Sequence, residues 1–288
     1  MRIRGETLLA RLLALAALAG AFATGAVAQG SVVTLAVTEG VTYQATPKEI
    51  RDKFAPLAEY VGKATGRHVK VVLVPAYDDL RVGLAKQEYD LAFVHPAHVA
   101  MAAIKAGRYR AIAWTSGFTD YTVSLLTNAG APMKTLDDVR GNTVVTPDPD
   151  SITAVMVRAM FRTGNLQTTD AKPPPPTAAR VITTRYQDAV PFYLENGFAQ
   201  VGATAARAVV KTWTDKGGSV LTQSRSVPIK QIIASTRMPA EEQDQIRDAL
   251  LGMSQTKAGR EALDAVGYKG FVAPNRDVEN AAIAWLGL

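Results

Sequence analysis

The chain alternates short runs of apolar, often β-branched residues with longer segments in which apolar residues recur every three or four positions. The first kind of run predicts buried strands over residues 32–38, 69–74, 90–94 and 110–115. The second kind predicts the helices between them. The first helix has the clearest boundaries, because Thr46, Pro47 and Glu49 form a capping box with proline in the first turn, and Gly66 follows the end. Strands that alternate with helices indicate a mostly parallel sheet covered on both faces.

A second set of elements follows with the same rhythm. Strands are predicted over residues 121–126, 142–146, 181–184 and 198–202, and helices over 151–161, 186–195 and 205–213. The proline run 173–176 fits only a surface connection. Extended segments over 220–227 and 229–234, a helix beginning at Pro239, and helices over 257–266 and 277–286 complete the chain. A chain of 288 residues commonly divides into two lobes or domains.

The first thirty residues have the pattern of a secretory signal. Arg2, Arg4 and Arg11 come before or at the edge of an apolar run over residues 12–23, and Ala26-Val27-Ala28 follows it. We predict a cleavable signal peptide over residues 1–28, with cleavage after Ala28, and therefore a periplasmic protein. The alternative is an uncleaved membrane anchor, but the apolar run is shorter than the ~20 residues that span a bilayer.

Composition narrows the classes of function. Cysteine is absent, which excludes disulfides, thiolate metal sites and a cysteine nucleophile. The net charge is +6, of which residues 1–28 contribute +2 (three arginines, one glutamate), leaving +4. The basic residues are scattered, so no nucleic-acid partner is expected. Hydrolase and nucleotide-binding motifs are missing, and the pair His95 and His98 is too small a set for a metal site. We therefore predict no catalytic residue, cofactor or metal.

An ordered set of local strings resembles a known family. The strings are residues 90–93 with Pro96, Tyr121, and residues 136–144, 148–153, 186–189 and 197–201. Together they resemble the periplasmic phosphonate-, phosphite- and phosphate-binding proteins of ABC importers, which are type II periplasmic binding proteins. The resemblance covers essentially all of the chain after the signal.

The resemblance implies an α/β, two-lobed periplasmic binding protein fold. Each lobe would hold a mixed, mostly parallel sheet flanked by helices, with the ligand in the cleft between the lobes. Lobe one would comprise residues 31–119 plus 226–288, and lobe two residues 120–225. Two hinge strands near residues 121–126 and 220–227 would join them.

The strongest candidate for ligand binding is the helix start at Ser151, Ile152 and Thr153. A helix start offers unpaired backbone N–H groups and a partial positive charge, and two hydroxyls would join them around an oxyanion. The family implies an oxyanion at this place, whereas the alternative from the residues alone is ordinary helix capping. Tyr121 and, with less support, Tyr77 would add phenol donors, although each could also be a packing residue.

Other candidates depart from the family pattern. His95 follows the third strand, where it could donate to the anion and respond to pH. Gln187 and Gln200 stand where relatives carry histidine and aspartate, so the resemblance argues against 2-aminoethylphosphonate. Glu39 and Tyr43, near the end of the first strand, are further candidates for contacts.

These observations predict a receptor that captures a small phosphorus oxyanion and delivers it to an ABC permease in the inner membrane, acting as a monomer. One alternative is a receptor of the same shape that signals to a sensor histidine kinase. A secreted hydrolase is a third possibility.

Overall fold

The computed structural model describes residues 32–39 and 46–288. The predicted signal peptide over residues 1–28 and the candidate Tyr43 lie outside this part of the chain. No helix among the described residues is both long and apolar enough to cross a membrane.

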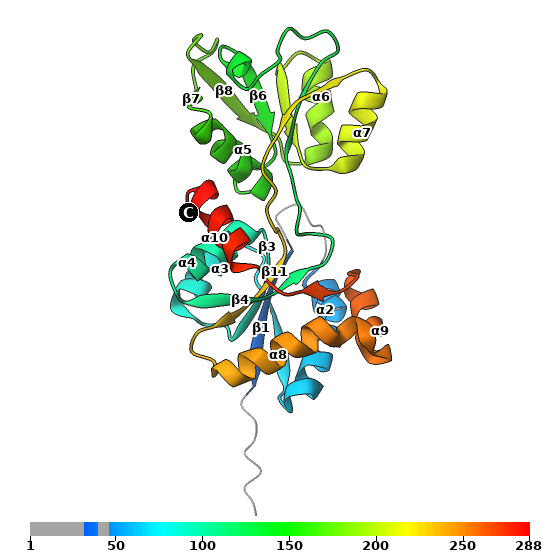
Figure 1. The fold of residues 1–288 in the computed structure, drawn as a ribbon. Coiled ribbons are helices and arrows are strands. Elements are labelled where there is room, and N and C mark those ends of the chain that lie inside the picture. Colours follow the sequence, from blue (N-terminus) through cyan, green and yellow to red (C-terminus); the bar gives the residue numbers. More distant parts are fainter. Residues whose placement is uncertain (1–31, 40–45) are drawn as a thin grey trace, which may run out of the picture.

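The described residues form two α/β lobes, each built around a six-stranded sheet (Figure 1). The lower lobe in Figure 1, lobe one, is formed by both ends of the chain. Its elements are β1 (Val33–Glu39), α2 (Pro47–Thr65), β2 (Val69–Leu73), α3 (Tyr77–Lys86), β3 (Leu91–His95), α4 (Ala97–Lys105), β4 (Tyr109–Thr115), β11 (Gln231–Ser235), α8 (Ala240–Gly252), η3 (Met253–Gln255), α9 (Lys257–Val266), β12 (Phe271–Val272) and α10 (Arg276–Leu286).

Lobe two is formed by the middle of the chain. Its elements are β5 (Ser124–Thr127), η1 (Asp137–Val139), β6 (Thr143–Thr146), α5 (Ile152–Thr163), β7 (Gln167–Thr169), β8 (Ala178–Thr183), η2 (Gln187–Ala189), α6 (Val190–Glu195), β9 (Val201–Thr204), α7 (Arg207–Asp215) and β10 (Ser219–Gln223). The short strands β7 and β12 were not predicted, because they contain only three and two residues.

Both sheets are mixed, as the sequence predicts. The strand orders are β12-β4-β11-β3-β1-β2 and β10-β5-β9-β6-β8-β7. In lobe one, β1 to β4 share one direction, and β11 and β12 run against them. In lobe two only β5, among the described strands, opposes the others. The reversed direction of β11 follows from the path of the chain. β11 enters the sheet as the chain returns from lobe two, and it pairs antiparallel with both β3 and β4.

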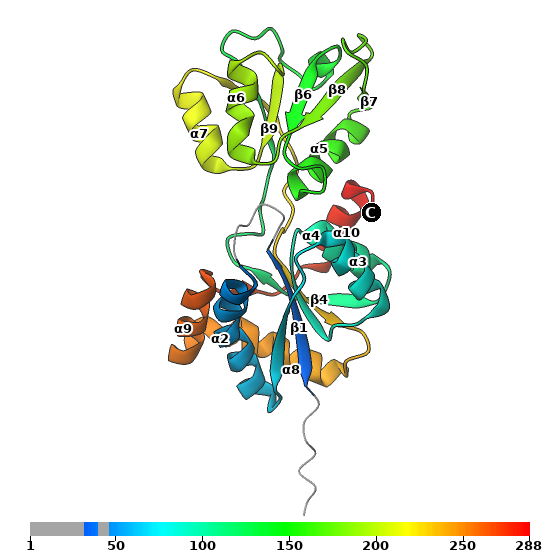
Figure 2. The same ribbon diagram turned by 180° about the vertical axis from the view of Figure 1, so that it is seen from behind.

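Helices cover both faces of each sheet (Figures 1 and 2). In lobe one, α2, α8 and α9 pack on one face through a core that includes Phe54, Phe93 and Leu263. Helices α3 and α4 pack on the other face, around Leu80 and Val94. The capping box predicted for α2 is present, and the helix ends at the left-handed Gly66. The periodic apolar positions of the sequence therefore become the sheet-facing sides of the helices, as amphipathic patterning requires.

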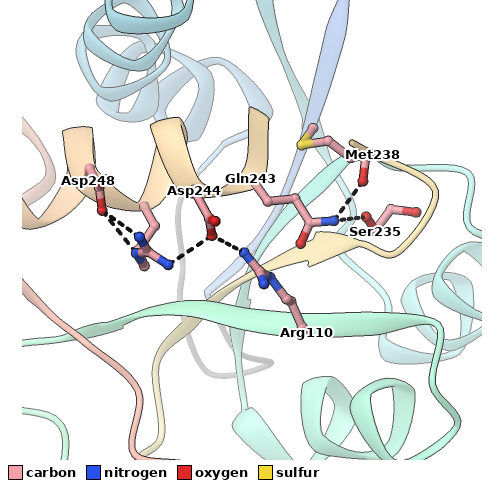
Figure 3. Close-up of polar contacts among 7 residues, drawn as sticks. Arg110, Ser235, Met238, Gln243, Asp244 and Asp248 are labelled. Carbon is pink, nitrogen blue, oxygen red and sulfur yellow. Dashed lines mark hydrogen bonds and ion pairs between the residues drawn. The ribbon is translucent and has the colours of Figure 1, made fainter. Parts of the chain in front are cut away.

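Helix α8 is attached to the sheet of lobe one by polar contacts as well as by its apolar face (Figure 3). Gln243 is buried and donates to the carbonyls of Ser235 and Met238 at 3.1 and 2.7 Å. Asp244 accepts from Arg110 of β4, and this guanidinium holds the pKa of the Asp244 carboxyl below its usual value. These contacts fix α8 across the end of β11 and thereby position the strand that leads back from lobe two.

Two segments cross between the lobes, residues 116–123 and 224–230. They are hydrogen-bonded to each other, because Tyr121 and Val227 exchange both backbone bonds at 3.1 and 2.9 Å. The hinge was expected in strands near 121–126 and 220–227, but much of those ranges belongs to β5 and β10 in the sheet of lobe two. Two further backbone bonds join the segments, from the N–H of Ile229 to the carbonyl of Phe118 at 3.0 Å and from the N–H of Ser224 to the carbonyl of Val123 at 2.8 Å, but neither segment forms a regular strand there.

Helix α10 forms a second connection between the lobes. It lies between α4 of lobe one and α5 of lobe two in both views (Figures 1 and 2). One hydrophobic cluster joins Met101 of α4, Met160 of α5 and Trp285 of α10 with Val123 and Val227 of the crossing segments. The apolar core therefore continues from one lobe into the other.

Replacing Trp285 by alanine should test this connection. Trp285 is 7% exposed, so the change leaves a large cavity between the lobes, and we expect the free energy of unfolding to fall by about 3 to 5 kcal/mol in urea titrations. Val278→Ala on the same helix is the control, because Val278 is 43% exposed and should cost less than about 0.5 kcal/mol. Equal losses for the two variants would show that α10 does not carry the connection.

Candidate functional site

The carboxyl edges of the two sheets face the crossing segments from opposite sides. In lobe one, β1 and β3 end side by side at Glu39 and His95. In lobe two, the crossing segment enters β5 at Ser124, which pairs with Thr204 at the end of β9. Ligands of α/β sheets bind outside such carboxyl edges. The arrangement therefore brings together the two edges at which binding residues are expected.

The predicted helix start is formed at the carboxyl edge of lobe two. Ser151 is the N-cap of α5, and its Oγ accepts from the backbone N–H of Ala154 at 3.2 Å. Helix geometry leaves the N–H groups of Ile152 and Thr153 without an acceptor inside the helix. The side chain of Ile152 packs in the core, so this residue offers only its backbone. Ser151 thus caps the helix, as the alternative from sequence held, and the first turn still presents N–H donors.

Three of the candidate side chains are joined in one hydrogen-bond network. The hydroxyl of Tyr121 lies 3.1 Å from Oγ1 of Thr153, and Nε2 of Gln187 donates to Tyr121 at 3.3 Å. The amide of Gln187 is oriented by its other end, because Oε1 accepts from the backbone N–H of Ala205 at 2.6 Å and from Thr204 at 3.3 Å. Residues 121, 153 and 187, distant in sequence, are therefore neighbours at the start of α5.

The polarity of this network follows from counting protons. Tyr121 and Thr153 each carry one hydroxyl proton, and the contact between them uses one of the two. Burial raises the pKa of Tyr121, which keeps its phenol protonated. Gln187 donates into the pair, so its amide takes neither proton. One hydroxyl proton is left over, and the network can donate it to an anion without carrying any formal charge.

His95 lies at the carboxyl edge of lobe one, but its protonation differs from the expectation. Its Nδ1 is 3.1 Å from the carbonyl of Ile229, and since a carbonyl only accepts, Nδ1 carries the proton. Burial, with a smaller contribution from the charge of Lys230, lowers the pKa of His95 to about 4. The ring is neutral near pH 7, so Nε2 is an acceptor. Nε2 of His95 therefore cannot donate to the anion, contrary to the expectation from sequence. As an acceptor, Nε2 can instead receive a hydrogen bond from a protonated oxygen or an amine.

Four further side chains gather beside His95, and the sequence reading missed three of them. Glu39 is bound by Nζ of Lys53 at 2.6 Å and by the hydroxyl of Tyr268 at 2.6 Å. Nζ of Lys230 donates to the hydroxyl of Tyr268 at 3.0 Å and lies 4.0 Å from Glu39. The Glu39 side chain is only 2% exposed, so its carboxylate serves this cluster and does not supply the open contact proposed from sequence.

Gln200 does not belong to this group of residues. Gln200 precedes β9 and accepts from the backbone N–H of Thr143 at 3.1 Å, at the amino edge of the sheet in lobe two. The length of β9 separates it from the site, so its assignment to the site was wrong. Tyr77 is buried at the start of α3, which follows the carboxyl end of β2 in lobe one, so it stays a candidate. Tyr43 stays a prediction, since it is outside the described residues.

One ion pair joins the two lobes beside the site. Arg81 of α3 lies 3.2 Å from Asp150, the residue before the N-cap of α5, and 2.8 Å from Asp78 of its own helix. Both partners of the interlobe pair are largely solvent-accessible, so the pair contributes little to stability. Its position nevertheless links the loop before the start of α5 to lobe one.

The comparisons with known proteins agree with this arrangement. A model of the family described as "ABC transporter, phosphonate, periplasmic substrate-binding protein" matches residues 40–278. The chain belongs to this family. Members of this family are the periplasmic substrate-binding components of phosphonate ABC transporters, and this chain is one of them. No curated protein matches the sequence closely enough to refine this assignment.

Solved structures of phosphonate-binding proteins and their relatives share the fold. XAC2383 from Xanthomonas citri bound to ATP superposes with a TM-score of 0.74 at 15% identity, over 90% of this chain and 98% of that one. PhnD1 from Prochlorococcus marinus in complex with methylphosphonate gives 0.60 at 11% identity, over 88% and 96%. A binding protein component of an ABC phosphonate transporter from Pseudomonas aeruginosa gives 0.58 at 18%, over 89% and 85%. At such identities the likeness concerns the two-lobed fold.

His98, in the first turn of α4, is a buried histidine whose protonation should affect the stability of the fold. It is 6% exposed, and neither ring nitrogen has a hydrogen-bond partner among the described residues. Burial, followed by the charge of Arg81, lowers the pKa of His98 to about 4. The folded state therefore resists protonation at a pH where the unfolded chain accepts it.

Stability should fall as the pH falls from about 6.5 towards about 4, because in this window the unfolded state binds more protons than the folded state. His98→Gln should reduce the loss between these pH values by about 1 to 3 kcal/mol, measured by urea unfolding at both. His68→Gln is the control, since His68 is exposed and should leave the loss unchanged. If His98→Gln also leaves it unchanged, His98 is not the group that resists protonation.

Proposed function

We propose that the protein captures a small phosphorus oxyanion between its lobes and delivers it to an ABC permease in the inner membrane. The observation that carries the proposal is the network of Tyr121, Thr153 and Gln187 at the first turn of α5, facing the carboxyl edge of lobe one. The lobes in this proposal divide at the crossing segments, with residues 31–119 and 226–288 in lobe one and 120–225 in lobe two.

The donors of this network suit an oxyanion with several oxygens. Three donors lie together at the start of α5. They are the N–H groups of Ile152 and Thr153 and the surplus hydroxyl proton of the Tyr121–Thr153 pair. Each donor is neutral, so the partial charge of the helix end supplies the attraction from this lobe. A tetrahedral phosphorus group carries several acceptor oxygens and can accept from all of these donors at once.

Contacts from both lobes explain how the ligand would hold the lobes together. A ligand shifts a conformational equilibrium only by the contacts that differ between the two states. An oxyanion at α5 that also touches the edge at His95 would add such contacts to the closed state. The ion pair of Arg81 and Asp150 would then add a weak bond across the same boundary. Closure of this kind is a hinge motion about the two crossing segments.

The choice of ligand and partner follows from the family and the neutral site. PhnD1 was solved with methylphosphonate and XAC2383 with ATP, and both ligands carry phosphorus oxyanions. Gln187 places an amide in the site, so a ligand amine would lack a carboxylate partner there. We therefore propose phosphate, phosphite or a simple alkylphosphonate. A permease is the proposed partner, and not a sensor kinase, because the family model describes a transporter component.

We further propose that residues 1–28 are removed during export to the periplasm, that the protein acts as a monomer, and that it binds its ligand without chemical change.

A ligand screen tests the central claim. The protein without residues 1–28 should show a higher melting temperature in the presence of phosphate, phosphite or methylphosphonate, because binding to the folded state alone stabilises it. At about 100 times the dissociation constant the gain is about 2.7 kcal/mol, which is several degrees for a chain of this size. Recovery of unaltered ligand after incubation would separate binding from hydrolysis. No shift with any of the three anions would refute the proposed substrate class.

Ser151→Ala tests the helix start. The variant loses the cap on Ala154 and a hydroxyl beside the proposed ligand, so affinity for the best anion of the screen should fall roughly tenfold in titration calorimetry. Thr256→Ala is the matched control. Thr256 caps α9 through the N–H of Gly259 at 3.0 Å, so its loss should cost a similar ~1 kcal/mol of stability while leaving affinity unchanged. Equal affinity in both variants would remove Ser151 from the site.

A further inference from the structure

We propose that Lys230 is the cationic specificity residue of lobe one, and that its ammonium contacts the oxyanion held by α5 of lobe two. This inference rests on the proposed function and names the charged group that the neutral donors of lobe two lack. It concerns the last residue of the crossing segment 224–230, immediately before β11.

The first support is position. Gln231 pairs with Val94 across β11 and β3, so Lys230 lies level with His95 at the carboxyl edge of lobe one, and Glu39 follows on β1. The residue before Lys230, Ile229, joins the two crossing segments at this edge, because its backbone N–H donates to the carbonyl of Phe118 at 3.0 Å. Lys230 thus stands where the edge of lobe one meets the hinge.

The second support is charge. Among the described residues of this cluster, two ammonium groups, Lys53 and Lys230, share the single carboxylate of Glu39. Lys53 makes the short contact at 2.6 Å, whereas Lys230 lies 4.0 Å away and reaches Glu39 only through Tyr268. His95 is neutral near pH 7. The cluster therefore carries one positive charge beyond what its own carboxylate neutralises, and that charge is closest to Lys230.

The third support is exposure. The side chain of Glu39 is 2% exposed and that of Lys230 is 15% exposed, so the carboxylate is covered whereas part of the lysine side chain remains exposed. Nζ of Lys230 lies 4.6 Å from the ring centre of Phe118 and 4.8 Å from that of Tyr268. These aromatic faces hold the ammonium in place without neutralising it. A fixed, partly desolvated cation is a strong partner for a phosphorus oxyanion, because charge-assisted hydrogen bonds are about twice as strong as neutral ones.

Four titratable groups from four segments of the described chain surround Lys230. Glu39 comes from β1, Lys53 from α2, His95 from β3 and Tyr268 from the segment after α9. Burial lowers the pKa of Lys230 to about 8; the charge of Glu39 opposes this shift, and the charge of Lys53 adds a smaller lowering. The ammonium is present below this pKa and is lost above it, so any contribution of its charge to binding must weaken as the solution becomes alkaline.

The test compares Lys230→Gln, Lys230→Arg and Lys63→Gln with the wild type by titration calorimetry, using whichever of phosphate, phosphite and methylphosphonate binds the wild type most tightly. Lys230→Gln should weaken binding about ten- to a hundredfold near pH 7, and Lys230→Arg should retain most of the affinity. Lys63→Gln removes the same charge from the far end of α2, where Lys63 is 74% exposed, and should leave affinity within about twofold.

A pH series separates a binding role from a structural one. Between about pH 7 and about pH 10 the affinity of the wild type should fall relative to that of Lys230→Arg, because the lysine loses its charge and the arginine keeps it. Taking this ratio cancels the ionisation of the ligand itself. A merely structural lysine would give a ratio that is constant with pH. Urea unfolding of each variant without ligand shows whether it is folded.

The outcomes are distinct. If the wild type binds one of the anions and Lys230→Gln binds it within about twofold, or if the ratio does not change with pH, the assignment of Lys230 is wrong while the proposed function stands. If Lys230→Gln does not fold, the pH-dependent ratio of wild type to Lys230→Arg decides the matter alone. If the wild type binds none of the three anions, the proposed function fails, and the assignment of Lys230 fails with it.

Discussion

The backbone bridge between Tyr121 and Val227 is the constraint on which the organisation of the molecule depends. It lies in the middle of a short series of backbone bonds between the two crossing segments, since Ile229 also donates to Phe118 and Ser224 to Val123. Because each residue of the bridge donates to the other, the segments move as a pair and favour one axis of rotation. The side chain of Tyr121 belongs to the network at the start of α5. One residue therefore belongs both to the hinge and to the site, so a ligand that touches the network also bears on the axis of closure.

In the proposed scheme the two lobes meet the anion in different ways. Lobe two offers neutral donors that are ordered by Gln187, and lobe one offers a charged cluster whose carboxylate is buried. Separating neutral recognition from charge has a physical advantage, since a desolvated charge is costly unless it is paired. In the proposed scheme the cation of lobe one remains partly hydrated until the ligand brings the two surfaces together. Neither lobe then has to bury an uncompensated charge alone.

The sequence predicted the elements well where local chemistry determines them. The capping box at Thr46, the strands ending at Glu39 and His95 and the helix start at Ser151 each follow from a few neighbouring residues. Prediction failed where a side chain depends on a distant partner. Tyr268 reaches Glu39 across 229 positions, and the proton of His95 is fixed by a carbonyl 134 positions away. No periodicity or local motif records such contacts. Gln200 failed for a related reason, because the edge of the sheet on which it lies is a property of the completed topology.

The apolar core that runs through α10 has an optical consequence. Of the three tryptophans in the chain, Trp213 lies inside lobe two, where its indole donates to the carbonyl of Thr127 at 2.9 Å, and Trp114 lies in β4 of lobe one. Trp285 alone of the three packs between helices of both lobes. The emission of an indole depends on its polar and apolar surroundings, and those of Trp285 change whenever the lobes shift. The protein therefore contains an intrinsic fluorophore at its moving boundary, with two others that serve as internal references.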